Sequence, residues 1–361
     1  MNKDVGIMES RLVRPVELSR LAVAAAVVGA AAIAAGPGHA ARPMKGPGAS
    51  YPGKAAAFKQ PKLVHGVLEV KGTRASDKIT LRLMAGQPGI LQVDVGDDGS
   101  ADFSFQRDQI SKILVDARAG DDSIRIDESN GVFTDSIPTT LDGGRGNDTL
   151  AGGSGAETLR GGRGNDVIDG NQGSDLALMG AGDDIFVWDQ GDGSDIVEGQ
   201  DGTDTMRFNS ANVAEHVDLT ANGSRLRFFR DAGNITMDTA GVERVEYNAL
   251  GGADVVTIND LSGTDVQSVT VDLAGALGGA AGDGQADRVI VNATNGEDRI
   301  DVNGDAGGVK VSGLAATVKI LHSEAANDRL DVNTLAGRDA VDSGGLAAGA
   351  IQLFVDGSKV L

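Results

Sequence analysis

The sequence predicts an all-β protein in which short strands and tight turns flank a central repeat. Three observations support this fold class. Apolar and polar residues alternate over short runs, a nine-residue repeat fills the middle of the chain, and helical periodicity is essentially absent after the first forty residues. Aromatic residues make up 3% of the chain and Gly occupies 53 of 361 positions, so small side chains must fill a thin core.

Residues 1–40 are typical of a secretory signal peptide. Basic residues up to Arg20 precede the apolar stretch Leu21–Gly36, and Gly38-His39-Ala40 places small residues where a signal peptidase cleaves. We therefore expect cleavage after Ala40. The alternative, an uncleaved anchor, needs roughly 20 apolar residues to cross a bilayer. We expect a secreted, extracellular or cell-surface protein whose mature chain has no membrane span.

The charge and the cysteine content exclude several classes of function. A net charge of -20 argues against a nucleic-acid partner, which requires clustered Lys and Arg, and favours cations. The sequence contains no Cys, which rules out disulfides, thiolate zinc sites and cysteine nucleophiles. Bound metal is then the remaining common way to stabilise the fold of an exported chain.

The chain divides into five predicted segments. The signal peptide is followed by a Pro- and Gly-rich linker over 41–62, an N-terminal β section over 63–141, the repeat over 142–208 and a C-terminal β section over 209–361. The last section carries pairs of acids eleven residues apart, which suggests a second solenoid-like part. These pairs are Asp254 with Asp265, Asp287 with Asp298, and Asp328 with Asp339.

The central repeat follows the pattern Gly-Gly-x-Gly-x-acid-x-aliphatic-x. Three consecutive copies begin at Gly143, Gly152 and Gly161. The register continues through Asp175 and Asp184, and two residues are inserted around Trp188-Asp189 before Asp195 and Asp204. Some positions depart from the pattern: Glu157 replaces Asp, Asn171 and Met179 replace Gly, and Ala177 stands at an aliphatic position.

The residue types of the repeat predict a calcium site. Glycines reach positive φ without steric cost, so the first six residues can form a tight loop with inward carbonyls. The acid adds a carboxylate, and Ca²⁺ takes about six to eight oxygens at roughly 2.3–2.6 Å, whereas Zn²⁺ prefers nitrogen and sulfur and Mg²⁺ demands a tighter octahedron. The aliphatic residue two places after the acid, such as Leu150 or Ile168, should point into the core.

The run resembles the hemolysin-type calcium-binding repeats of RTX proteins. That resemblance implies a right-handed parallel β-roll, or β-solenoid, in which two nonapeptides make one coil and Ca²⁺ lies between a loop and the loop two repeats later. It implies that Asp148 pairs with Asp166, Asp166 with Asp184, Glu157 with Asp175, and Asp175 with Asp195. The predicted ligands are the acids Asp148, Glu157, Asp166, Asp175, Asp184, Asp195 and Asp204 with the backbone of Gly144, Gly146, Gly153, Gly155, Gly162, Gly164, Gly173, Gly180 and Gly182.

Other candidate sites carry weaker signals. The acids around Gly99 fit no EF-hand spacing and are interpreted as an acidic turn. Trp188, the only Trp, is expected to fill the core where the repeat breaks. The four His residues are isolated, and neither H-E-x-x-H nor G-x-S-x-G occurs, so we expect no enzyme activity.

The sequence favours a secreted calcium-binding protein that folds when the ion binds. Two alternatives remain open. One is a cell-surface adhesin or structural protein that contacts cell-surface polysaccharide or protein. The other is a polysaccharide-modifying β-helix enzyme, which would need stacking aromatics in a groove.

Overall fold

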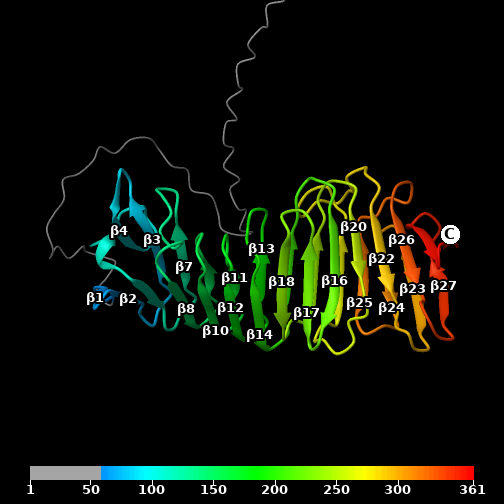
Figure 1. Cartoon of the computed structure of the whole chain (residues 1–361), viewed down its shortest axis with the longest axis horizontal. Helices are drawn as coiled ribbons and strands as arrows, with labels where there is room; N and C mark the ends of the chain where they lie inside the picture. Colours follow the sequence, from blue (N-terminus) through cyan, green and yellow to red (C-terminus); the bar gives the residue numbers. More distant parts are fainter. Residues whose placement is uncertain (1–57) are drawn as a thin grey trace, which may run out of the picture. The chain divides into compact units, whose positions relative to one another are not determined.

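The computed structural model describes residues 58–361; the predicted signal peptide, its cleavage site and most of the linker lie outside them. The described residues are nearly all β, as predicted, and form two sheets that run side by side along the molecule (Figure 1). The exceptions to strand and loop include the short 3₁₀ turn η1 (Arg107–Gln109). No helix among these residues is long and apolar enough to cross a membrane.

The first sheet contains fifteen strands. In spatial order they are β1 (Lys62–Val64), β2 (Val67–Lys71), β6 (Lys112–Asp116), β8 (Thr139–Arg145), β10 (Thr158–Arg163), β12 (Leu176–Ala181), β14 (Ile196–Asp201), β18 (Ile235–Ala240), β17 (Arg225–Arg230), β16 (His216–Asn222), β20 (Val255–Ile258), β22 (Arg288–Asn292), β26 (Arg329–Asn333), β28 (Gln352–Val355) and β29 (Ser358–Lys359).

The second sheet contains fourteen strands. In spatial order they are β27 (Ala340–Leu346), β23 (Arg299–Asp305), β24 (Gly308–Ser312), β25 (Thr317–Leu321), β21 (Ser268–Asp272), β19 (Arg244–Asn248), β15 (Thr205–Asn209), β13 (Ile185–Trp188), β11 (Val167–Asp169), β9 (Thr149–Ala151), β7 (Ser123–Asp127), β3 (Lys78–Met84), β4 (Gln87–Val95) and β5 (Phe103–Gln106).

The central strands form a parallel β-roll with two nonapeptides per coil. Thr149 of β9 lies beside Val167 of β11, eighteen residues later, and the same step relates β10 to β12. Beyond the insertion the step becomes twenty residues, as between Ile185 of β13 and Thr205 of β15. The two extra residues therefore lengthen one turn and leave the strand register intact.

Antiparallel insertions interrupt the roll after β15. Strands β16, β17 and β18 form a meander in the first sheet, whereas β19 pairs directly with β15 in the second. A second meander, β23–β24–β25, lies in the second sheet. Each sheet thus contains one of the two meanders. The coils continue between and beyond them through β20, β22, β26 and β28.

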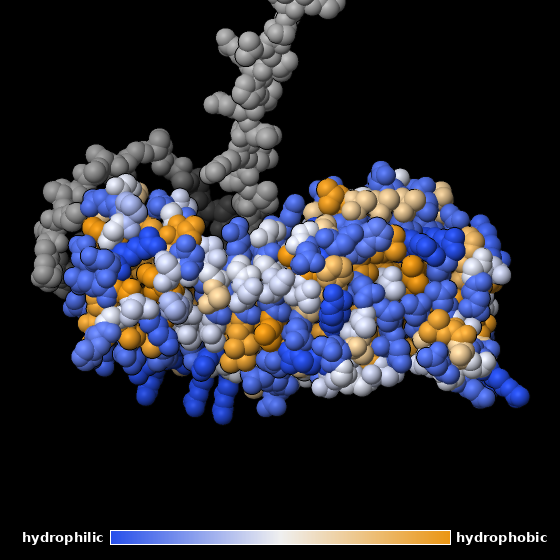
Figure 2. Space-filling view, viewed as in Figure 1, coloured by the Kyte–Doolittle hydropathy of each residue, from blue (hydrophilic) through white to orange (hydrophobic). Residues whose placement is uncertain are grey.

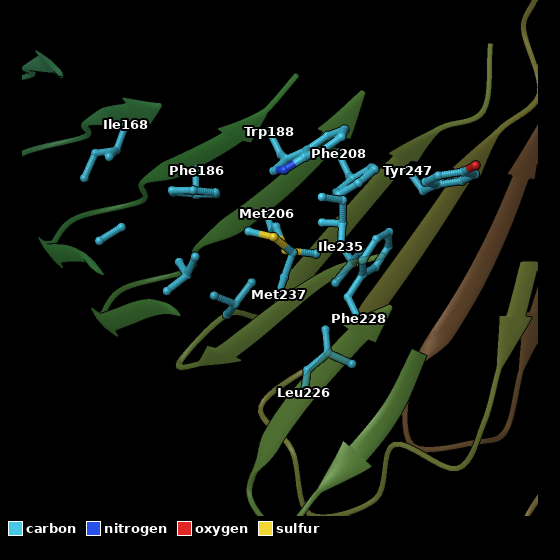
Figure 3. Packing of buried hydrophobic residues seen from close by; sticks show 14 of the residues in the cluster. Ile168, Phe186, Trp188, Met206, Phe208, Leu226, Phe228, Ile235, Met237 and Tyr247 are labelled. Carbon is cyan, nitrogen blue, oxygen red and sulfur yellow. The ribbon is translucent and has the colours of Figure 1, made fainter. Parts of the chain in front are cut away.

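The core lies between the sheets and is filled by alternate residues of each strand. In the roll it is thin: Leu150, Leu159 and Ile168 are fully buried. Near the insertion, aromatic side chains gather in the core, as Figure 3 shows. There Trp188 stacks on Phe208, with ring centroids 3.9 Å apart, and its indole N–H donates to the carbonyl of Gly193 at 2.8 Å. The expectation that Trp188 fills the core at the break in the repeat is confirmed.

The acidic segment around Gly99 is a structural turn, as interpreted. Asp94 is fully buried, and its Oδ2 accepts hydrogen bonds from Arg82 Nη1 and from the main chain of Gly99, both at 2.9 Å. The neighbouring Asp102 accepts the N–H of Val95 at 2.7 Å. These protein donors occupy the carboxylates and give the segment its shape.

The eleven-residue spacing links the two strands of one coil. Asp287 and Asp298 immediately precede β22 and β23, one in each sheet, and Asp328 and Asp339 precede β26 and β27 in the same way. The step between equivalent acids of successive coils is longer: the N–H of Asp287 donates to Asp328, 41 residues later. The step from coil to coil here is therefore far longer than the eleven-residue spacing by itself indicates.

Candidate metal centre

A row of acidic residues, here called the first ladder, runs along the edge where the second sheet begins its strands. Each acid is the residue before a strand, and the main-chain N–H of every acid but the last donates to the carboxylate of the equivalent acid in the next coil. The bonds span 2.6–2.9 Å and join Asp77, Asp122, Asp148, Asp166, Asp184, Asp204 and Glu243 in that order. The acids line up because each one immediately precedes a strand of the second sheet, so each has the same position within its coil.

A second ladder lies where the first sheet begins its strands. Glu157 donates its N–H to Asp175 Oδ1 at 2.7 Å, and Asp175 donates to Asp195 Oδ1 at 2.9 Å. These hydrogen bonds therefore join each of the four pairs of acids that the resemblance implies. In each pair the two carboxylates belong to consecutive coils on one side of the roll.

The ladder acids of the roll are buried, and each keeps one carboxylate oxygen without a partner in the described part of the chain. Asp148, Asp166, Asp184 and Asp204 are at most 1% exposed. The oxygens without a hydrogen-bond donor are Oδ2 of Asp148, Asp166, Asp175, Asp184, Asp195 and Asp204, and Oε1 of Glu157. A buried charge with no partner is costly, so such oxygens indicate a site that holds a cation or a proton.

The glycines of the loops are required by two features of the stack. Gly162 and Gly164 have φ values of +115° and +117°. A Cβ on either would lie 2.2 Å or 2.1 Å from the carbonyl oxygen of Gly144 or Gly146 in the preceding coil. The loops therefore stack carbonyl on glycine, which brings main-chain oxygens of neighbouring coils together.

The first glycine of each copy makes room for the carboxylate. A Cβ on Gly143 or Gly161 would lie 2.4 Å from Oδ2 of Asp148 or Asp166. The oxygens without donors thus lie against the loop backbone. The side chains alone do not form a cage, because no group of three or more His, Asp or Glu residues within 58–361 could hold a metal ion. A cation here must take carboxylates together with loop carbonyls, which is an oxygen-only set that suits Ca²⁺.

Comparison with known proteins decides the nature of this segment. The family model of the RTX calcium-binding nonapeptide repeat matches four copies in this chain, over residues 140–167, 151–186 and 191–212. Residues 140–212 are an RTX repeat array. RTX nonapeptide repeats bind Ca²⁺, and the carboxylates and carbonyls of the array are the groups that fit this ion.

No curated protein matches the chain. The extracellular lipase LipA from Serratia marcescens is similar in structure with a TM-score of 0.19 and 10% sequence identity, over 59% of this chain. The match spans 43% of the lipase chain, less than half of its length.

Burial gives the acids of the RTX array raised pKa values, chiefly because desolvation disfavours the charged form. The pKa of Asp166 is about 7 and that of Asp175 about 9, with neighbouring ladder carboxylates adding to both shifts. The same cause raises the pKa of Asp195 to about 7 and that of Asp204 to about 6. Bound protons and bound calcium would therefore compete for the same oxygens.

The departures from the repeat pattern have different consequences in the RTX array. Oε2 of Glu157 accepts the N–H of Gly153 at 2.7 Å, so the longer side chain bends back on its own loop. Asn171 takes a φ of +59°, a positive value as at Gly144, Gly162 and Gly180, where φ lies between +102° and +120°. Asp195 follows the insertion, yet it remains in the second ladder, where it accepts the N–H of Asp175.

The ladder extends beyond the predicted residues. Asp77, Asp122 and Glu243 belong to the first ladder, and a third ladder of Glu215, Asp254, Asp287 and Asp328 precedes strands of the first sheet. Sequence reasoning noted some of these acids without assigning them to a site. A usable signal was present, because an aliphatic residue follows each of them by two positions, as Ile124 follows Asp122 and Val289 follows Asp287.

Proposed function

We propose that the chain is an exported, non-enzymatic Ca²⁺-binding protein whose RTX array folds when the ion binds. The observation that supports this most directly is the set of buried ladder carboxylates with an oxygen that has no protein donor. In the absence of metal the ionised carboxylates repel one another and are buried away from water. Calcium supplies the positive charge that they lack, so its binding free energy becomes folding free energy.

The ligands in this proposal are those predicted from the repeat. Asp166 illustrates the arrangement: it accepts the N–H of Asp148 through Oδ1 at 2.7 Å, and Oδ2 is left for the cation. Loop carbonyls such as those of Gly144 and Gly162 complete the set. The segment 142–208 is then the calcium-dependent part of the chain, between the sections 63–141 and 209–361.

The section after the array contains neutral contacts that need no ion, in addition to the third ladder of acids. Asn292 donates its side-chain N–H to Asn259 at 2.9 Å, and Asn333 donates to Asn292 at 2.8 Å. A similar bond joins Asn248 to Asn209 at 2.7 Å. Amide ladders carry no charge to neutralise, so the strands beside them, β22 and β26, are expected to stay folded in chelator.

Export is part of the proposal. The N-terminal segment has the features of a cleavable signal, and the extracellular space holds millimolar Ca²⁺ in many settings, at which weak extracellular-type sites fill. Figure 2 shows hydrophilic and hydrophobic residues interspersed over the face that it draws. Edman sequencing of the protein collected outside the cell should begin at Ala41.

Circular dichroism and calorimetry test the folding claim. The mature protein should gain β signal when Ca²⁺ is added, lose it in chelator, and bind several ions. An identical spectrum with and without Ca²⁺, together with ion binding, would show that binding and folding are separate. Screening against esters and acidic glycans tests the absence of catalysis, and calcium-dependent turnover would contradict it.

A further inference from the structure

The loop of residues 117–122 precedes β7 and lies before the residues that match the RTX repeat. Its sequence, Ala117-Arg118-Ala119-Gly120-Asp121-Asp122, lacks the first two glycines of the pattern. Nevertheless, it stacks on the loop 143–148 as one RTX loop stacks on another. The N–H of Asp122 donates to Asp148 Oδ1 at 2.7 Å, which is the distance from Asp148 N to Asp166 Oδ1.

The neighbouring hydrogen bonds repeat as well. The N–H of Asn147 donates to Asp121 Oδ1 at 2.8 Å, and the N–H of Asn165 donates to Asn147 Oδ1 at 2.8 Å. A Cβ on Gly146 would lie 2.0 Å from the carbonyl oxygen of Gly120, which matches the 2.1 Å between Gly164 and Gly146. The oxygens of the loop 117–122 therefore occupy the places that RTX loop oxygens occupy.

The backbone reaches this shape without the usual glycine. Arg118 has a φ of +83° and Gly120 one of +118°, beside +102° and +124° at Gly144 and Gly146. A non-glycine residue is strained in this region unless the surroundings hold it there. The stack on the next loop is what holds it.

The observation that indicates a ligand is the carboxylate of Asp122. This side chain is 3% exposed, and its Oδ2 has no partner among the residues that the structure describes. The preceding acid of the ladder differs, because Oδ2 of Asp77 accepts the N–H of Thr73 at 2.6 Å. The first ladder thus contains two kinds of acid. In a closed acid, such as Asp77, Oδ2 accepts a hydrogen bond from the protein. In an open acid, such as Asp122, Oδ2 has no donor among the described residues.

We propose that the loops 117–122 and 143–148 hold a further Ca²⁺, one coil before the recognised array. The carboxylates of Asp122 and Asp148 and the stacked main-chain carbonyls of the two loops are its donors. Ala117 occupies the position of the first glycine, and Met179 shows that a side chain at this position is compatible with an RTX loop. The inference rests on calcium binding by the array.

The test counts bound ions by native mass spectrometry of the exported protein in calcium. Asp122→Asn keeps an oxygen for the N–H of Asp77, which donates at 2.6 Å, and removes only the charge. It should bind one Ca²⁺ fewer than the wild type. Asp77→Asn, the matched control at the closed acid, should bind the full number. An unchanged count in Asp122→Asn, with a reduced count in Asp166→Asn, would overturn the site.

A measurement on the wild type removes dependence on the variant's folding. Crystals grown with Ca²⁺ should show anomalous density between the loops 117–122 and 143–148, at roughly 2.3–2.6 Å from Asp122 Oδ2. Density between the loops 143–148 and 161–166 with none at Asp122 would overturn this inference alone. Density at neither place would also remove the support for calcium binding by the array, so the two failures are distinguishable.

Discussion

The main-chain N–H of Asp148 donates to Oδ1 of Asp166 at 2.7 Å across the eighteen residues of one coil, while Oδ2 of Asp166 has no donor within the described chain. One carboxylate thus joins two coils and also presents a buried oxygen to a cation. The contact that stacks the coils and the group that binds the ion are the same side chain. Folding of the array and occupancy by calcium are therefore expected to be coupled.

Replacing the charge of Asp166 tests this double role. Asp166→Asn keeps an acceptor for Asp148 but removes the negative charge from the loop, so calcium affinity should fall at least about tenfold, or about 1.4 kcal/mol. Calorimetric titration measures the loss. Asp108→Asn changes the charge equally at an exposed position on η1 and should leave the affinity unchanged. Equal affinities for both variants would contradict the assignment.

Alanine substitutions at two glycines distinguish the destabilisation caused by a positive φ from the destabilisation caused by close stacking of the coils. Gly164 has a φ of +117° and would place a Cβ 2.1 Å from the carbonyl of Gly146, whereas Gly191 has a φ of +114° with open space around it. Gly191→Ala should cost about 1–2 kcal/mol. Gly164→Ala should cost more, since the coils must also move apart. Thermal denaturation of the two calcium-loaded variants measures the difference. Equal melting temperatures would show that close stacking does not contribute to the cost of Gly164→Ala.

Much of this fold follows from periodicity, and the part that does not has a physical cause. The nine-residue step fixes the strands, the core positions of Leu150 and Ile168, and the acids of the array, because each coil repeats the same local chemistry. The meander β16–β17–β18 was not predicted, since its pairing with β14 and β20 depends on contacts between distant segments. Asp122 was not assigned to a site because the conformation of its loop is imposed by the next coil on Arg118, where the motif expects glycine.

The pKa shifts predict opposite pH trends with and without calcium. The pKa of Asp166 is raised from 3.8 to about 7 and that of Asp175 to about 9 by burial. A raised pKa means that the metal-free fold is most stable below the unfolded pKa and loses stability as pH rises through the folded pKa. Calcium requires the ionised form, so its apparent affinity should rise over the same interval.

This pH trend is measured by melting the protein between about pH 5 and about pH 8 in chelator and in calcium. The melting temperature in chelator should fall with pH, and the stabilisation by calcium should grow. Parallel curves under the two conditions would show that the ladder acids do not bind the ion.

Trp188 offers a built-in probe of the roll. It is 1% exposed and stacks on Phe208, at the point where the array meets the first meander. Its emission should shift to longer wavelength when chelator unfolds the array. Trp188→Ala removes a large buried ring and should destabilise the calcium-loaded protein by about 3–5 kcal/mol, measured by denaturant unfolding followed by circular dichroism. A loss below about 1 kcal/mol would show that the stacked rings are dispensable.

Hydrogen exchange of the exported protein, with calcium and then with chelator, tests the central claim most directly. The main-chain amides of Asp148, Asp166 and Asp184 should be protected in calcium and should exchange at least about a hundredfold faster in chelator. The amides of β22 and β26, beside the Asn259–Asn292–Asn333 ladder, should stay protected in both and serve as the internal reference. Equal protection of the three Asp amides under both conditions would contradict the account.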